Sequence, residues 1–273
     1  MNRVIPGYPL SIGVTLLYLS LIVLLPLGAL MAQALGIGWE RYIAILSGER
    51  TQAAFRVTFT AAAFATVFNA IYGLALAWVL VRYEFPGRRL LDALVDVPFA
   101  LPTAVAGIAL SALFARNGWF GAPLAELGIA VAYTPIGIAV AMAFTSIPFV
   151  VRTVQPVLED LAADVEEAAA TLGASDRRIF TRVIFPALFP AFLTGCALSF
   201  ARSLGEFGAV IFIAGNLPLK TEVVSLLAFI RIEEYDYQAA AAIAATLLGI
   251  AFAMLLLVNT IQMWQQRRVG SEG

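Results

Sequence analysis

The chain has 273 residues, of which 61% are hydrophobic and 13% are charged, and its mean hydropathy is +0.90. Soluble domains average about 45–50% apolar and about 25% charged residues, so this composition excludes a soluble globular protein. The net charge of −1 leaves no basic excess of the kind that indicates nucleic-acid binding.

Six apolar stretches organise the chain. Each is long enough for an α-helix to cross about 30 Å of hydrocarbon, whereas a membrane barrel would show short alternating strands. They lie at about residues 10–34, 57–81, 94–115, 129–151, 187–214 and 238–263. The sequence therefore predicts an all-α membrane protein with six transmembrane helices. Residues 1–273 form a single domain with one longer loop, at about 152–186.

The connections between these stretches differ in their content of basic residues. One set holds ten arginines: Arg3, Arg82, Arg88, Arg89, Arg152, Arg177, Arg178, Arg182, Arg267 and Arg268. The other set holds six basic residues: Arg41, Arg50, Arg56, Arg116, Lys220 and Arg231. Because basic residues are enriched in cytoplasmic loops, we expect both termini and the loop at 152–186 to face the cytosol.

Isolated polar side chains interrupt the second and third stretches. Asn69 and Thr103 can line a polar pathway or hydrogen-bond between packed helices, and we favour helix packing for both. Asp96 lies near the start of the third stretch, where we expect it to pair with a cation or to lie at the membrane interface.

The loop at 152–186 is too polar to enter the bilayer. Its first part places apolar residues at steps of three and four, which predicts one stripe along a single helix: Leu158, Leu161, Val165, Ala168 and Leu172. Acidic residues cover the neighbouring faces: Glu159, Asp160, Asp164, Glu166 and Glu167. Helices that lie on anionic lipid headgroups usually present Lys or Arg instead, so the acids favour docking to a cytosolic partner.

A bend and a second helix follow within the same loop. Gly173 can adopt the left-handed conformation that ends a helix, and Ser175 is a good N-cap for a helix that begins at Asp176. The negative charge of Asp176 suits a helix N-terminus. We expect Pro186 and Pro190 to bend the fifth stretch or delay its start.

Two ionisable residues lie four positions apart in the fifth stretch. Arg202 and Glu206 can neutralise each other on one helix face. Charges are costly at membrane depth, so the pair is expected either to line the pathway of an anion or to serve as a structural ion pair, and we favour the structural role. Gly205 and Gly208 flank Glu206 and permit close helix approach, for packing or for a constriction.

Catalysis by this chain is not expected. It has no histidine, which removes Ser-His and Cys-His catalysis and the commonest metal ligand. Its single lysine, Lys220, follows leucine, so a phosphate loop ending in Gly-Lys is absent and ATP hydrolysis by that route is excluded. Its single cysteine, Cys196, is expected to act as a small packing residue. We therefore predict a non-catalytic subunit with no bound cofactor and no metal site.

One motif in the loop carries a family resemblance. Glu167-Ala168-Ala169, then Gly173, then Val183 and Ile184-Phe185-Pro186 resemble the EAA loop of the permease subunits of ABC importers. Val183 and Phe185 stand where that family usually has Ile and Leu. The resemblance implies the type I ABC-importer permease fold and a coupling helix that sits in a groove of a cytosolic ATPase. Glu167, Ala168, Ala169 and Gly173 are then the ATPase-coupling residues.

Further stretches narrow the resemblance over nearly the whole chain. They are LPTAVAGIAL at 101–110, PFVVRTVQPVLEDL at 148–161, LGEFGAVIFIAGNLP at 204–218 and EEYDYQAAAAIA at 233–244. Together they resemble the T-type permeases of bacterial sulfate and thiosulfate importers. Molybdate permeases share the EAA loop, so molybdate is the alternative substrate. A self-sufficient secondary transporter is a third hypothesis, with Asp96 and Glu206 as its ion-coupling acids.

The resemblance also implies partners and a location. The partners are a second, W-type permease, two copies of an ATPase that carries ATP and Mg²⁺, and a periplasmic sulfate- or thiosulfate-binding protein. The expected location is the bacterial inner membrane, in contact with lipid, and no nucleic acid is expected.

Overall fold

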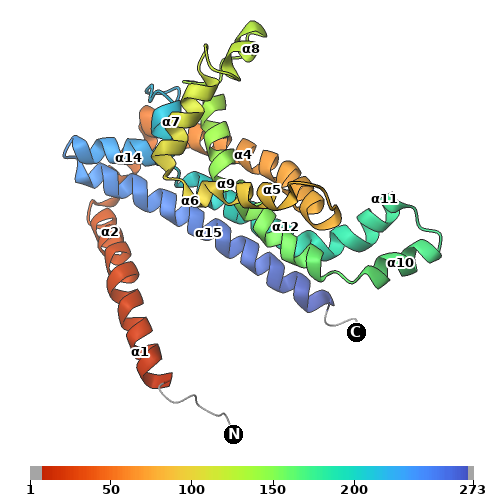
Figure 1. The fold of residues 1–273 in the computed structure, drawn as a ribbon. Coiled ribbons are helices and arrows are strands. Elements are labelled where there is room, and N and C mark those ends of the chain that lie inside the picture. Colours follow the sequence, from red (N-terminus) through yellow and green to blue (C-terminus); the bar gives the residue numbers. More distant parts are fainter. Residues whose placement is uncertain (1–7, 270–273) are drawn as a thin grey trace.

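A computed structural model describes residues 8–269, which fold into helices joined by short irregular connections (Figure 1). The elements are α1 (Tyr8–Leu19), η1 (Ser20–Leu24), α2 (Leu25–Leu35), α3 (Trp39–Ser47), α4 (Glu49–Arg82), α5 (Arg88–Val95), α6 (Val97–Ala100), α7 (Thr103–Phe114), α8 (Gly121–Glu126), α9 (Pro135–Asp160), α10 (Ala163–Thr171), α11 (Asp176–Ile179), η2 (Phe180–Ile184), α12 (Phe185–Leu204), α13 (Gly208–Ile213), α14 (Val224–Glu233) and α15 (Tyr237–Val269), with η1 and η2 being π-helical turns.

Five helices in the described part of the chain are long and apolar enough to cross a membrane: Leu10–Leu35, Glu49–Arg82, Pro135–Asp160, Asp176–Leu204 and Tyr237–Thr260. The predicted all-α membrane architecture is confirmed, and five of the six predicted spans correspond to these helices. Arg3, which entered the charge count, lies outside the described residues, as do the side chains of Arg267 and Arg268.

The third predicted span is wrong as one continuous helix. Residues 94–115 are divided among the end of α5, α6 and α7. The main break is at Leu101, which is extended because the following Pro102 disfavours the helical conformation before it. The 12-residue α7 has a length of about 18 Å, too short to cross about 30 Å of hydrocarbon.

The fourth and fifth spans also have different limits from those predicted. α9 begins at Pro135 instead of residue 129 and continues to Asp160, so it includes the start of the expected loop. The fifth helix is continuous through α11, η2 and α12 from Asp176 to Leu204, and residues 208–213 form the separate helix α13. Pro186 and Pro190 were expected to bend the fifth stretch or delay its start, and a delayed start is wrong because the helix already begins at Asp176. The π turn η2 lies directly before Phe185 and Pro186, and its wider backbone accommodates a proline that lacks an N–H.

Three long helices, α4, α9 and α12, form the centre of the bundle. Glycines allow them to pack closely: a Cβ on Gly73 of α4 would lie 2.9 Å from Val150 Cβ of α9, and one on Gly195 of α12 would lie 2.8 Å from Val150 Cα. Small residues at helix interfaces are typical of membrane proteins, where close backbone approach supplies much of the packing energy. This centre holds the buried polar side chains described below.

The N-terminal rod formed by α1, η1 and α2 projects away from the bundle (Figure 1). Ala34 is its only buried residue among those described, and it packs with Ala241 and Ala245 of α15. The rod is therefore attached to the rest of the chain chiefly at its α2 end.

Candidate functional site

The loop after α9 contains one separate short helix, α10, which is shorter than predicted, and the second expected helix is the start of the continuous helix from Asp176 to Leu204. Leu161 and Ala162 are extended and separate α9 from α10. The single apolar stripe predicted from Leu158 to Leu172 is therefore wrong. Leu158 is buried at the end of α9, whereas Leu172 is 88% exposed beyond α10.

The residues of the EAA motif lie on α10 and at its end. Glu167 and Ala168 are exposed and Ala169 is half-buried. Gly173 has φ +78°, the left-handed conformation that was expected to end the helix, and its N–H donates to Ala170 O at 2.9 Å. The second helix begins at Asp176 as predicted, with Ser175 at the N-cap position but without a hydrogen bond from its side chain.

Glu166, beside the motif, is paired within the chain. Arg82 at the end of α4 donates a hydrogen bond from Nη2 to Glu166 Oε1. The Arg82 guanidinium also lies 5.5 Å from the centre of the Trp78 ring, and Trp78 makes an edge contact with Phe180 of η2 at 5.4 Å between ring centres. Sequence reasoning missed this contact, because no local pattern connects residues that are 84 positions apart.

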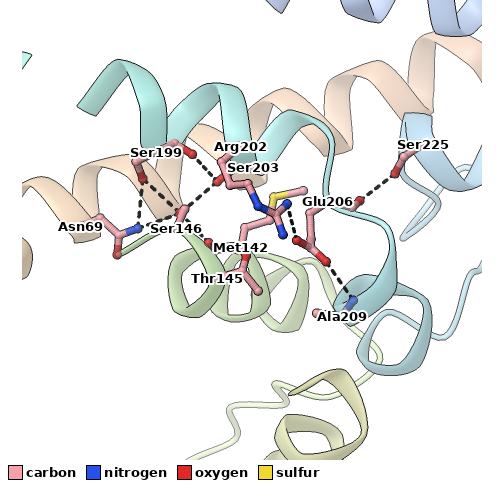
Figure 2. A network of polar contacts seen from close by, with 10 residues as sticks. All are labelled: Asn69, Met142, Thr145, Ser146, Ser199, Arg202, Ser203, Glu206, Ala209 and Ser225. Atoms are coloured by element: carbon pink, nitrogen blue, oxygen red, sulfur yellow. Dashed lines mark hydrogen bonds and ion pairs between the residues drawn. The ribbon is translucent and has the colours of Figure 1, made fainter. Parts of the chain in front are cut away.

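The expected pair of Arg202 and Glu206 is formed at the end of α12 (Figure 2). Arg202 Nη1 lies 2.7 Å from Glu206 Oε2 and forms an ion pair with it. The angle between the two groups does not meet the geometry of a hydrogen bond, so the contact is purely ionic. Glu206 is 1% exposed, whereas the Arg202 side chain is 32% exposed. Glu206 Oε1 accepts a hydrogen bond from Ala209 N at 2.9 Å, and its backbone carbonyl accepts one from Ser225 Oγ at 2.7 Å. Glu206 thus joins α12, α13 and α14.

A neutral polar cluster lies beside this pair, at the contact of α4, α9 and α12 (Figure 2). The Asn69 side-chain nitrogen is within hydrogen-bond distance of Ala143 O, Ser146 Oγ and Ser199 Oγ, at 3.1, 2.8 and 3.1 Å. Ser199 and Ser203 donate to Ser146 at 3.0 and 3.2 Å. The packing role expected for Asn69 is confirmed. The serines were missed, although Ser199 and Ser203 stand one helical turn apart.

Asp96, the other acid considered for ion coupling, is also paired. Arg152 of α9 holds it with two hydrogen bonds of 2.8 and 2.7 Å and contacts Asp92 at 2.6 Å. Arg152 therefore joins α5 and the start of α6 to α9. In the described part of the chain, no group of three or more His, Cys, Asp or Glu side chains is arranged to hold a metal ion.

The glycines near Glu206 behave differently from one another. A Cβ on Gly208 would lie 2.1 Å from Thr103 Oγ1 of α7, and one on Gly107 of α7 would lie 2.4 Å from Ala209 O of α13. A Cβ on Gly205 would meet no atom within 4 Å. Close approach therefore occurs between α7 and α13, and it depends on Gly107 and Gly208.

Taken together, the geometry shows an exposed acidic helix at one place and a buried polar centre, joined to a helix break, at another. The continuous helix from Asp176 to Leu204 connects them, because α11 follows α10 and α12 ends at the Arg202–Glu206 pair. The described residues thus place the exposed loop and the buried polar centre at the two ends of one continuous helix.

Comparisons with known proteins agree with this arrangement. Residues 70–271 match the model of the family described as the binding-protein-dependent transport system inner membrane component. The chain is 56% identical over 268 residues to the sulfate transport system permease protein CysT of Salmonella typhimurium, covering 98% of this chain and 97% of that protein. It is 46% identical over 254 residues to the protein of the same name from Synechocystis, covering 93% and 89% of the two chains.

The fold is found in solved structures of low sequence identity. A chain of the bacterial alginate ABC transporter, in complex with its alginate pentasaccharide-bound periplasmic protein, superposes with a TM-score of 0.75 at 17% identity and covers 94% of each chain. A chain of the MetNI methionine ABC transporter gives a TM-score of 0.55 at 16% identity, covering 85% of this chain and 99% of that one. Both likenesses concern the fold alone.

Proposed function

This chain belongs to the family of binding-protein-dependent transport system inner membrane components, and from that premise we propose that it is the membrane-spanning subunit of an ATP-driven sulfate importer. The observation that carries the proposal is the 56% identity over nearly the full length to a sulfate transport system permease. Thiosulfate is a second substrate in this proposal. Molybdate is the alternative, and uptake experiments distinguish the three anions.

α10 is the proposed contact with a cytosolic ATPase. Glu167 and Ala168 are exposed on it, and Gly173 fixes the turn that follows. Two apolar side chains near Glu167 are also exposed, Val165 by 48% and Leu172 by 88%. Exposed apolar surface of this kind favours contact with a groove of a partner protein over contact with water. In this proposal two ATPase copies bind ATP and Mg²⁺, and this chain binds neither.

The remaining partners follow from the kind of transporter. We propose a second, W-type permease that completes the pathway and a periplasmic protein that delivers the anion. The alginate transporter of similar fold forms a complex with a substrate-bound periplasmic protein, which supports the second of these partners. The location in this proposal is the bacterial inner membrane, with both termini and α10 on the cytoplasmic side.

For Arg202 and Glu206 we propose a structural role within the pathway-forming bundle. One oxygen of the Glu206 carboxylate forms an ion pair with Arg202, and the other accepts a hydrogen bond from the Ala209 N–H. Glu206 therefore stabilises the break between α12 and α13, and Arg202 supplies the compensating charge. Both acids that a secondary transporter would need, Asp96 and Glu206, are paired with arginine, which argues against ion coupling by either.

Uptake of radiolabelled sulfate in a bacterial strain that lacks its own permease tests the proposal. We expect uptake that depends on this chain and is reduced by excess unlabelled thiosulfate but not by molybdate. The double variant Glu167→Arg/Gly173→Trp is expected to insert in the membrane, to lose copurification with the ATPase and to lose uptake. Proteoliposomes that contain this chain but no ATPase provide the opposite test. Sulfate uptake into them that is driven by an ion gradient would refute the proposal.

A further inference from the structure

α10 is attached to the rest of the chain by few contacts. It is bounded by the extended residues Leu161 and Ala162 on one side and by Gly173 on the other. Most of its described side chains are exposed. Among the described residues, the ion pair of Glu166 with Arg82 is the only side-chain ion pair or hydrogen bond between α10 and another element. This pair is therefore the polar contact that holds α10 against α4, beside the packing of Ala169 on the buried cluster that contains Leu80 of α4.

Arg82 is itself held in place by its neighbours. Its side chain is 24% exposed, as is that of Glu166, so the pair is partly shielded from water. The guanidinium lies over Trp78, one turn earlier on α4, while it reaches Glu166. A planar guanidinium can stack on an aromatic ring and donate a hydrogen bond at the same time, which a lysine ammonium does less well.

The contact extends through Trp78 to the neighbouring helix. Phe180 of η2 meets the edge of the Trp78 ring, and Trp78 and Phe180 pack on the same buried cluster as Leu80 and Ile179. The Arg82 contact thus links three elements at one point: α10, the end of α4 and the start of the continuous helix from Asp176 to Leu204.

From this geometry we propose that Arg82 is a positioning residue for coupling: it fixes α10 against α4, so that a displacement of α10 moves α4 together with the helix from Asp176 to Leu204. The proposal rests on the proposed function, since it presumes that a partner moves α10. Glu166 serves this internal contact, whereas Glu167 beside it remains exposed for the partner.

The test uses the complete transporter, with its second permease, ATPase and periplasmic protein, reconstituted in proteoliposomes. Sulfate import and ATP hydrolysis are measured together. We expect Arg82→Glu and Glu166→Arg each to raise the ATP hydrolysed per sulfate imported about tenfold, within the usual range of coupling between sites. The charge-swapped double variant Arg82→Glu/Glu166→Arg is expected to recover part of the coupling, because it restores the ion pair without the contact to the Trp78 ring. Arg82→Lys, which keeps the charge and loses the ring contact, is expected to give an intermediate ratio.

The matched control is Arg89→Glu. Arg89 is exposed at the start of α5 and makes no ion pair among the described residues, so we expect its ratio of ATP to sulfate to be unchanged. A double variant that assembles fully and stays as uncoupled as the single variants would overturn the proposal. So would an unchanged ratio in Arg82→Glu.

A second measurement separates this proposal from the proposed function. Spin labels at Ala170 of α10 and Ala75 of α4, both exposed, report the distance between the two helices in a chain whose Cys196 is replaced by serine. We expect one narrow distance distribution, broadened by Arg82→Glu and narrowed again in the charge-swapped variant. If the wild-type transporter imports no sulfate, the proposed function fails, while an unaltered distribution in Arg82→Glu rejects the positioning role.

Discussion

Glu206 is a buried acid whose two carboxylate oxygens have different partners, Arg202 and the N–H of Ala209. Arg202→Met would leave this charge unpaired. We expect a loss of about 2–3 kcal/mol in the free energy of unfolding, less than the roughly 3–5 kcal/mol of a fully buried pair because the Arg202 side chain is 32% exposed. Thermal unfolding in detergent measures the change.

The double variant Arg202→Met/Glu206→Gln provides the comparison. A glutamine carbonyl oxygen can still accept the Ala209 N–H, and no buried charge remains, so we expect stability to return to within about 1 kcal/mol of wild type. Sulfate uptake should return with it if the pair is structural. A double variant that is stable but transports nothing would assign Arg202 a direct contact with the anion instead.

Asn69 supports the buried contact of α4, α9 and α12. Asn69→Leu removes the donor shared by Ser146, Ser199 and the Ala143 carbonyl, and we expect a destabilisation of about 1–2 kcal/mol, as for other interhelical hydrogen bonds in membranes. Thr60→Val, on an exposed position of the same helix, should change stability by less than about 0.5 kcal/mol. Equal effects of the two substitutions in thermal unfolding would contradict this role.

Individual residues were predictable from the sequence where a local rule governs them. Gly173 takes the left-handed conformation and Asp176 begins a helix, because turn and capping preferences act within a few residues. Arg202 and Glu206 were paired from their four-residue spacing. The contact of Arg82 with Glu166 was not predictable, because it depends on how α10 folds back against α4.

At the scale of elements, we expect the close contact between α7 and α13 to be important for both stability and transport. A Cβ on Gly107 would lie 2.4 Å from Ala209 O and 2.7 Å from Ala209 Cα, so Gly107→Ala must push the two backbones apart. We expect a loss of about 1–3 kcal/mol in stability and a marked loss of uptake. Thermal unfolding and sulfate uptake are measured on the same preparation.

Gly249→Ala in α15 is the control for this substitution. Its Cβ would meet no atom within 4 Å, and alanine is favoured over glycine inside a helix by about 1 kcal/mol. We expect unchanged uptake and equal or higher stability. If Gly107→Ala also left uptake and stability unchanged, the close packing of α7 on α13 would not be required for transport.

The limits of the elements were harder to predict than their existence. Apolar stretches located the long helices, because burial in lipid requires about 20 apolar residues whatever the details. The break at Leu101 was missed although Pro102 signals it locally, since hydropathy continues undisturbed across it. The end of α9 at Asp160 was missed because the apolar period continues through Leu161 into α10.

At the scale of the whole molecule, the asymmetry of ten against six basic residues predicts one orientation in the membrane. In a chain with Cys196 replaced by serine, new cysteines at Ser175 and at Trp119, which is 85% exposed between α7 and α8, report opposite sides. We expect an impermeant maleimide to label Trp119→Cys in intact spheroplasts and Ser175→Cys only after permeabilisation. The reverse pattern would place α10 outside the cell and invert the predicted orientation.

The overall architecture was predictable because composition and motif spacing are properties of the full sequence. An all-α membrane protein with a helical loop before the fifth helix followed from residues 152–186 being polar within an apolar chain. The polar centre of the bundle was not predictable beyond Asn69. Serines are common at many helix interfaces. The sequence alone therefore does not show that Ser146 of α9 and Ser199 and Ser203 of α12 form one hydrogen-bonded cluster.

The continuity of the helix from Asp176 to Leu204 has a mechanical consequence. At a rise of about 1.5 Å per residue it measures about 43 Å, more than the thickness of the hydrocarbon layer. A tilt of about 5° around its midpoint would carry each end through about 2 Å, in opposite directions. In the proposed transporter, a small push on the Asp176 end of this helix would therefore produce a shift in the opposite direction at the Arg202–Glu206 pair, because no loop interrupts the helix between these two ends.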